Sequence, residues 1–543
     1  MANQRTEHKL SGQGAMQKIR VAVRAGNADQ ARTLCRRVAL SQHVSGPVQL
    51  ELRARVAWSD LLMLRVEQAR KLLSPFLSPD HRTTARKMEA RFSRKGSQFA
   101  AALLTTQLSA FHYRTIDNRA AEHLARLAER LLGSMTEEVS QIDLSIAVSN
   151  NRIHLSRILW RQGDREAAER VLQAATDLIM TRLSRVWNAS AEPRPKTESS
   201  ANSKGGLLLQ LAFALDLGAG YDWVRGNLNE ARRKIYQASS ILRTDEVFCA
   251  PSLAHSLWVC GRVEATASEY GYPLALTWLD ESQQGFQSIR HPLYYRVRTQ
   301  IAQCLAKAGR DDAAQQILDD MKTQEKPRIE RGHDSERRFV QAEIHLTRVW
   351  IAQASARRTR EWSEYLESAR ELEKAPGKTP RLTAEAKLHV GLGLSRTAGE
   401  NCRDAAQEAL QDALAFATER DYRKIAIGAR LGLCESLLSD DRREEAIEHR
   451  ETASRELLSI NSTFLARWAD DLGQRLAGPV FFEFDPRAKL DDAIKSFKAH
   501  FVAHASQAAK SKKDLQRQLG VSRATVWRIL NPDRDRSEVG LNG

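Results

Sequence analysis

Basic side chains gather near the end of this 543-residue chain, in the segment from Arg487 to Arg536. The segment holds 12 lysines and arginines against 5 acidic residues, a net charge of +7 in 50 residues. Cationic side chains bind the phosphates of nucleic acids, and an arginine near the start of a helix can also reach a guanine edge in the major groove. The candidate DNA-binding residues are Lys512, Lys513, Ser522, Arg523, Ala524, Thr525, Trp527 and Arg528.

Two short helices joined by a sharp turn would position these side chains. Gly520 permits the turn, Val521 fills the angle between the helices, and Ser522 is a favourable N-cap for the second helix. The apolar positions at helical spacing are Leu515 and Leu519 before the turn, and Val526, Ile529 and Leu530 after it. This pattern leaves the candidate residues at the start of the second helix facing outward.

A longer helix is predicted just upstream, from Leu490 to Ala508. Its apolar residues follow steps of three and four, which places them on one face. They are Leu490, Ile494, Phe497, Phe501, Ala505 and Ala508.

The order of long helix, short helix, turn and final helix resembles the Fis family of DNA-binding domains. The resemblance implies that the helix at 488–508 forms a homodimer and that the last helix enters the major groove. Carried over by position, the residues that would contact DNA are Ser522, Arg523, Ala524, Thr525, Trp527 and Arg528. The sequence departs from the family at Gln516, where the family usually has a small alanine at the helix crossing. A helical hairpin used only for protein contacts is the alternative.

A different pattern fills most of the chain upstream: a short turn with Gly, Asn or Asp, followed by an Ala-rich amphipathic helix. Clear examples begin at Arg24, Gln162, Arg225 and Ala308, and looser ones at Gly399 and Ser439. Glycine tolerates the left-handed conformation that ends one helix, and alanine lets the next helix pack closely. The pattern therefore predicts repeated αα-hairpins.

This pattern resembles a degenerate tetratricopeptide repeat, although its intervals are irregular compared with the family's period of about 34 residues. The resemblance implies a superhelical array with a concave face that binds a protein or peptide partner. Some helix pairs between the clear examples must then be unrecognisable in the sequence. A scaffold without a ligand is the alternative.

These patterns give a domain plan. We predict N-terminal helical repeats over 1–188, a flexible loop or linker over 189–206 and C-terminal helical repeats over 207–477. A connector over 478–487 and the Fis-like domain over 488–543 follow. The predicted fold class is all-α, a superhelical array of αα-hairpins followed by a small three-helix helix-turn-helix domain.

Composition agrees with an all-α protein, because only 28 glycines and 14 prolines are available for turns. The N-terminus has no apolar signal region, and the most apolar stretch, Gly205 to Gly220, is interrupted and too short to cross a bilayer. The six cysteines are scattered, as expected of free thiols in a reducing cytoplasm. We find no motif for catalysis, a cofactor or a metal, so we expect neither an enzyme nor a membrane protein.

The sequence therefore predicts a cytoplasmic, nucleoid-associated bacterial regulator. The array would bind a protein or peptide partner, and the tail would bind double-stranded DNA. The alternative is a non-enzymatic adaptor in a signalling or defence complex that uses its tail for tethering or dimerisation. Residues 1–486 carry a net charge of +10 and the last seven residues carry −1, which together with the +7 of the basic segment give the total of +16. Because the charge is concentrated at the tail, we expect the acidic partner there alone.

Overall fold

A computed structural model of the chain describes residues 46–477 with short gaps, together with isolated positions on either side. The gaps are 95, 136–138, 191–197, 246, 248, 268–271, 324–333, 398–401 and 461. The isolated positions are 18, 19, 30, 33, 34, 494, 497, 498, 501, 502, 505, 522 and 525.

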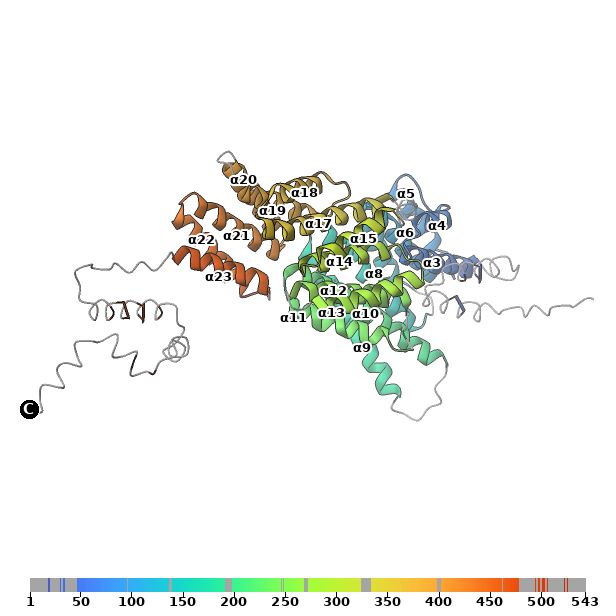
Figure 1. The fold of residues 1–543 in the computed structure, drawn as a ribbon. Coiled ribbons are helices and arrows are strands. Elements are labelled where there is room, and N and C mark those ends of the chain that lie inside the picture. Colours follow the sequence, from blue (N-terminus) through green and yellow to red (C-terminus); the bar gives the residue numbers. More distant parts are fainter. Residues whose placement is uncertain are drawn as a thin grey trace, which may run out of the picture. The chain divides into compact units, whose positions relative to one another are not determined.

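Helices account for the regular structure of the described residues, which confirms the predicted all-α fold (Figure 1). The first ten are α3 (Gly46–Leu62), α4 (Val66–Leu73), α5 (His81–Phe92), α6 (Gln98–Arg114), α7 (Asn118–Gly133), α8 (Gln141–Gln162), α9 (Arg165–Ser190), α10 (Glu198–Arg225), α11 (Leu228–Leu242) and α12 (Ala250–Ala267). The others are α13 (Tyr272–Ser288), α14 (Leu293–Lys307), α15 (Asp311–Thr323), α17 (Asp334–Thr359), α18 (Ser363–Lys374), α19 (Pro380–Arg396), α20 (Arg403–Glu419), α21 (Arg423–Ser439), α22 (Arg443–Leu457) and α23 (Thr463–Ala477).

The predicted αα-hairpins are confirmed at the turns that begin at Gln162, Arg225, Ala308 and Ser439, whereas the turns that begin at Arg24 and Gly399 lie outside the described residues. Gly163, Gly226 and Gly309 all have positive φ, of 96°, 87° and 74°, and each ends the first helix of a pair. Asp164 then caps α9 by accepting a hydrogen bond of 3.1 Å from the Ala167 amide. The alanines expected at the close helix crossings are fully buried: Ala168, Ala231, Ala314, Ala406 and Ala446.

The irregular spacing of the pattern has a structural cause. Six other left-handed positions, each at a turn between helices, are filled by residues other than glycine: Leu64, Ile116, Arg290, Arg360, Asp421 and Asp441. These turns use the same left-handed conformation as the recognisable ones, but four of them have a residue other than Gly, Asn or Asp at that position: Leu64, Ile116, Arg290 and Arg360. Only Asp441 lies within a hairpin that the pattern identified.

Ile116 offers a direct test of the strain at such a turn. Its φ is 68°, a conformation that strains a β-branched residue. Because Ile116 is 64% exposed, few packing contacts offset this strain. Replacing Ile116 with asparagine, which adopts this conformation readily, should raise the free energy of unfolding by about 1 kcal/mol in urea denaturation. Ile116→Val keeps the branched Cβ and should give no gain; an equal gain from valine would contradict the explanation.

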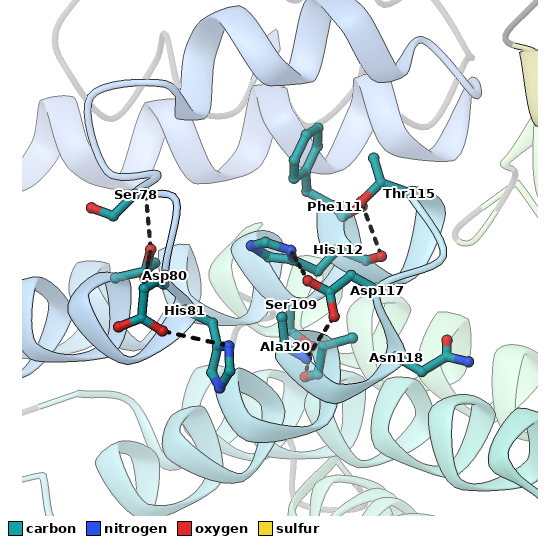
Figure 2. A network of polar contacts seen from close by, with 12 residues as sticks. Ser78, Asp80, His81, Ser109, Phe111, His112, Thr115, Asp117, Asn118 and Ala120 are labelled. Atoms are coloured by element: carbon teal, nitrogen blue, oxygen red, sulfur yellow. Dashed lines mark hydrogen bonds and ion pairs between the residues drawn. The ribbon is translucent and has the colours of Figure 1, made fainter.

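Aspartate caps fix the starts of neighbouring helices in the N-terminal part of the array (Figure 2). Asp80 accepts hydrogen bonds of 3.1 Å from the amides of Arg82 and Thr83, and these bonds lower the pKa of its carboxyl. Asp117 likewise accepts from the Ala120 amide at 3.1 Å, and its other oxygen lies 3.4 Å from Nδ1 of His112. Each cap satisfies an amide that would otherwise lack a partner at the helix end.

The core is a series of apolar clusters that follow one another along the array rather than a single centre. One cluster joins α3 to α7, and others follow around α8–α10, α10–α12, α12–α15 and α17–α21. Each helix pair therefore buries its apolar surface mainly against its neighbours, as expected of a helical-repeat array.

The predicted linker over 189–206 is too long. α9 continues to Ser190 and α10 already begins at Glu198, so only residues 191–197 separate the two helices, and these lie outside the described residues. Because α10 packs against both α8 and α9, the array does not divide into two halves here. The serines and glycines that suggested a loop lie in the first turns of a helix whose apolar continuation stabilises it.

The chain forms two compact units, Met1–Leu472 and Gly473–Gly543. The predicted connector at 478–487 lies outside the described residues, as does most of the predicted Fis-like domain. The five cysteines that the structure describes are free thiols.

One described helix segment, Lys204–Arg225 of α10, is long and apolar enough to cross a membrane by length and composition. It is longer than the apolar stretch that the sequence suggested. Its polar side chains are engaged with the array, because Asp222 accepts a 2.7 Å hydrogen bond from Lys234 of α11 and Asp216 accepts one of 3.3 Å from Ser256 of α12. In this structure α10 is a core helix of the array.

Candidate functional site

Alternate helices of the array from α6 onward, together with α3, line an internal channel. These inner helices are α3, α6, α8, α10, α12, α14, α17, α19, α21 and α23. From α3 to α21, each inner helix packs against the next inner helix along the chain, and the helices between them contribute little to the cavity walls. A side chain on an inner helix can therefore meet side chains from repeats that are distant in the sequence.

Contacts across the array close this channel. Arg225, at the end of α10, lies 3.2 Å from the carboxylate of Asp421, just before α21. At another point, buried His291 donates from Nε2 to the carbonyl of Leu62 at 3.0 Å. Burial lowers the pKa of His291 to about 3, so the ring is neutral, and Nδ1 accepts from the Leu293 amide.

The channel contains two neighbouring cavities of about 370 Å³ and 560 Å³. They share the wall residues Trp223, Val224, Arg262, Arg381 and Tyr422. The smaller one, called the α19 cavity below, lies among α10, α12, α14, α17, α19, α21 and α23. Its volume is in the range of cavities that hold small organic ligands.

Cations and aromatic rings dominate both cavities. The basic residues are Arg114, Arg157, Arg161, Arg262, Arg296, Lys307, Arg357, Arg358, Arg381, Arg396 and Lys424. The acidic residues on the walls are Asp216, Glu343 and Glu385. The channel is therefore strongly basic, although the array as a whole is nearly balanced. The sequence analysis found a concentration of positive charge only at the tail and did not identify this one; the prediction of an acidic partner at the tail stays a prediction.

Aromatic faces hold several of these cations. The guanidinium of Arg262 lies 4.0 Å from the ring centre of Trp223 and 4.9 Å from that of Trp258. The ammonium of Lys307 lies 4.1 Å from the ring centre of Trp350. An aromatic face attracts a cation without neutralising it, so the positive charge remains available to a ligand.

A row of buried or half-buried polar side chains, Tyr365, His389, Glu385 and Arg381, includes the acidic group of the α19 cavity. Burial raises the pKa of Tyr365, so its hydroxyl stays protonated and donates to Nδ1 of His389 at 2.7 Å. Nε2 of His389 then carries the proton that faces Glu385, 3.6 Å away. The other oxygen of Glu385 accepts a 2.8 Å hydrogen bond from Arg381.

The predicted DNA-binding residues fall largely outside the described residues. These are Lys512, Lys513, Arg523, Ala524, Trp527 and Arg528. Ser522 and Thr525 are described: Thr525 is helical, and its amide donates a 3.2 Å hydrogen bond to the hydroxyl of exposed Ser522. This is an N-cap bond, as the sequence predicted for Ser522.

Sequence reasoning did not identify the channel residues. Arg262, Lys307, Arg381 and Lys424 belong to four different helices, and no spacing in the sequence relates them. The sequence offered only a weak indication of the channel. Each of these four cations lies on the first helix of a hairpin, next to the apolar residues of that helix. Among the described residues, no three histidine, cysteine or acidic side chains are arranged to hold a metal ion.

No protein family and no curated protein match the sequence. The solved structures that are similar over most of the chain include the following three. A Rap protein complexed with competence and sporulation factor is 11% identical, with 86% of this chain and 99% of that chain covered and a TM-score of 0.38. Aspartyl phosphate phosphatase F from Bacillus subtilis is 11% identical, with 82% and 94% covered and a TM-score of 0.32. Cut9 in the APC/C hetero-tetramer Cut9-Hcn1 is 13% identical, with 86% and 90% covered and a TM-score of 0.32.

All three TM-scores lie below 0.5, so these likenesses carry no information about ligand or activity. The assignment of the fold rests on the helices of this chain: an all-α array of αα-hairpins wound around a basic channel.

Proposed function

We propose that this chain is a bacterial DNA-binding transcriptional regulator whose helical array binds a protein or peptide partner. The observation that carries the DNA-binding part is the N-cap bond from the Thr525 amide to Ser522. It begins a helix at the position where the Fis-like pattern requires the recognition helix. The regulator would be non-catalytic and would act in the cytoplasm on the nucleoid.

The charge around this cap supports the proposal. The segment from Arg487 to Arg536 has a net charge of +7; Arg523 follows the cap directly, and Arg528 comes six residues after it. A helix that presents arginine in its first turn can place it against base edges, while the surrounding lysines contact phosphates.

Dimerisation through the 488–508 helix is part of this proposal. Ile494, Phe497 and Phe501 are helical, share one face and are 40%, 50% and 50% exposed, whereas Val502 is 3% exposed. The rings of Phe497 and Phe501 stack with centres 6.1 Å apart. An apolar stripe of this kind on a short unit is suited to packing against a second copy.

Replacing Phe497 and Phe501 together with asparagine should therefore halve the mass of the protein in light scattering at micromolar concentration. Lys498→Asn, an exposed neighbour on the same helix, serves as the control and should leave the mass unchanged. A wild-type protein that is monomeric throughout would contradict the dimer.

The channel favours a second candidate function, a non-enzymatic adaptor in a multiprotein complex. Its support is that most of the chain builds one channel, whereas the tail is short. In an adaptor the tail would serve for tethering or dimerisation, and partner binding would persist without it.

The deciding experiment selects fragments from genomic DNA with the full chain and with a chain that lacks residues 478–543. A regulator should enrich defined sites only when the tail is present. Failure of the full chain to enrich any site over random competitor would refute the proposal, and a partner still captured by the shortened chain would then favour the adaptor.

A further inference from the structure

The α19 cavity contains three cations, Arg262, Lys307 and Lys424, that form no ion pair with a carboxylate among the described residues. Lys424, on α21, forms no hydrogen bond or ion pair with any residue that the structure describes. Lys307 contacts the face of Trp350, and Arg262 contacts the faces of two tryptophans. The buried Nε of Arg262 also lacks a hydrogen-bond partner among the described residues.

The nearby carboxylates are already engaged. Glu385 accepts from Arg381 at 2.8 Å, and Glu343 accepts from Gln303 at 2.9 Å and lies 4.0 Å from Arg381. The cavity region thus has two more positive than negative charges, because its two carboxylates, Glu385 and Glu343, face four cations. The cations are Arg262, Lys307, Arg381 and Lys424. Two other arginines of the cavity differ in this respect, because Arg358 pairs with Asp311 and Arg396 with Glu435.

This excess charge works against the stability of the empty protein. Burial and repulsion by Lys307 lower the pKa of Lys424 to about 8, and burial and repulsion by Arg381 lower that of Arg262 to about 9. The side chain of Lys307 is exposed to the cavity rather than to the outer surface. Because protein surrounds the cavity, burial lowers the pKa of Lys307 as well. Residues that served only packing would not need charges that repel one another.

The chemistry that would relieve the repulsion is a small dianion. Lysine and arginine donors bind phosphate well, and the side-chain amides of Gln300 and Gln353 on the same wall suit the rest of an organic ligand. The volume of about 370 Å³ is much larger than a single inorganic ion needs and suits a molecule of nucleotide size.

We propose that the α19 cavity binds a small organic phosphate, whose phosphate dianion is held by Arg262, Lys307, Arg381 and Lys424. This inference is independent of DNA binding by the tail. The array would thereby respond to a phosphorylated small molecule.

The test uses the full chain and measures calorimetric binding and the thermal midpoint with three probes at matched ionic strength. Adenosine 5′-monophosphate should bind and raise the midpoint, inorganic phosphate should do so more weakly, and uncharged adenosine should do neither. Binding of inorganic phosphate as tight as that of the nucleotide would assign the site to free phosphate. No binding of either phosphate would overturn the proposal. The proposal would also be overturned if a pentaglutamate peptide bound and neither adenosine 5′-monophosphate nor inorganic phosphate did. That result would assign the channel to an acidic peptide.

Variants connect the binding to the cavity. Replacing Lys307 and Lys424 together with methionine should weaken the nucleotide by about tenfold or more, because each lost charge-assisted hydrogen bond is worth that order of affinity. The same change should raise the thermal midpoint of the empty protein, since it removes the repulsion. Lys387→Met is the matched control, because Lys387 lies on α19 but pairs with Asp412 of α20.

Lys424→Arg keeps the charge and should retain binding, which provides a second variant if the double variant does not fold. Undiminished nucleotide binding by the double methionine variant would place the ligand elsewhere and overturn the assignment.

Discussion

Replacing Glu385 with glutamine is expected to lower the free energy of unfolding at pH 7 by about 3 kcal/mol, because the change removes one partner of a buried ion pair. Glu385 is the acidic group of the α19 cavity, where it binds Arg381 at 2.8 Å and lies 3.6 Å from His389. Without it, Lys307 and Lys424 would face Arg381 with less compensation. Urea denaturation followed by tryptophan fluorescence measures the effect.

Glu408→Gln is the matched control, because Glu408 is an exposed carboxylate on the outer helix α20 and its loss should change little. A Glu385→Gln protein as stable as the wild type would show that the carboxylate does not compensate the cavity cations.

The same carboxylate predicts a pH dependence. Burial acts to raise the pKa of Glu385, but His389, Arg381 and Lys307 outweigh burial and bring it to about 2, below the ordinary 4.5. A group whose pKa is lowered by folding stabilises the protein above its unfolded pKa and loses that contribution as the pH falls to the folded value. The wild type should therefore lose this stability between pH 4.5 and pH 2, and its advantage over Glu385→Gln should shrink over the same range.

Arg523→Ala is expected to weaken specific DNA binding by about 1–3 kcal/mol, which is the usual cost of losing a bidentate contact to guanine. The reason is the position of Arg523 directly after the Ser522 cap, in the first turn of the predicted recognition helix. Fluorescence anisotropy with the selected site and with a scrambled site separates specific from non-specific loss. If five or six cations touch phosphates, the logarithm of the affinity should fall with that of the salt concentration at a slope of roughly −5.

Arg534→Ala, a basic residue beyond the predicted recognition helix, is the control for net charge. Should Arg523→Ala weaken binding equally on both sites, Arg523 contacts a phosphate rather than a base. Unchanged binding on both sites would remove Arg523 from the interface.

Local patterns in the sequence predicted the hairpins because their causes are local. Gly163 and Gly226 end helices with a left-handed residue, and Asp164 caps the helix that follows. The prediction was incomplete at Ile116 and Arg290, because a strained residue can occupy the same conformation when the packing of the two helices requires it. It was wrong over Glu198–Gly206, where serines and glycines join a helix stabilised by its apolar continuation.

The two candidate sites also differ in how far local sequence determines them. The N-cap at Ser522 depends on a residue and its neighbour three positions later, so the sequence was sufficient to predict it. Arg262, Lys307, Arg381 and Lys424 meet only because small rotations between successive hairpins add up to a closed superhelix. Composition and order along the chain therefore established helices, turns and a basic end. The winding of those helices decided that the nearly balanced array would gather its cations into one channel, because that depends on contacts between residues far apart in the chain.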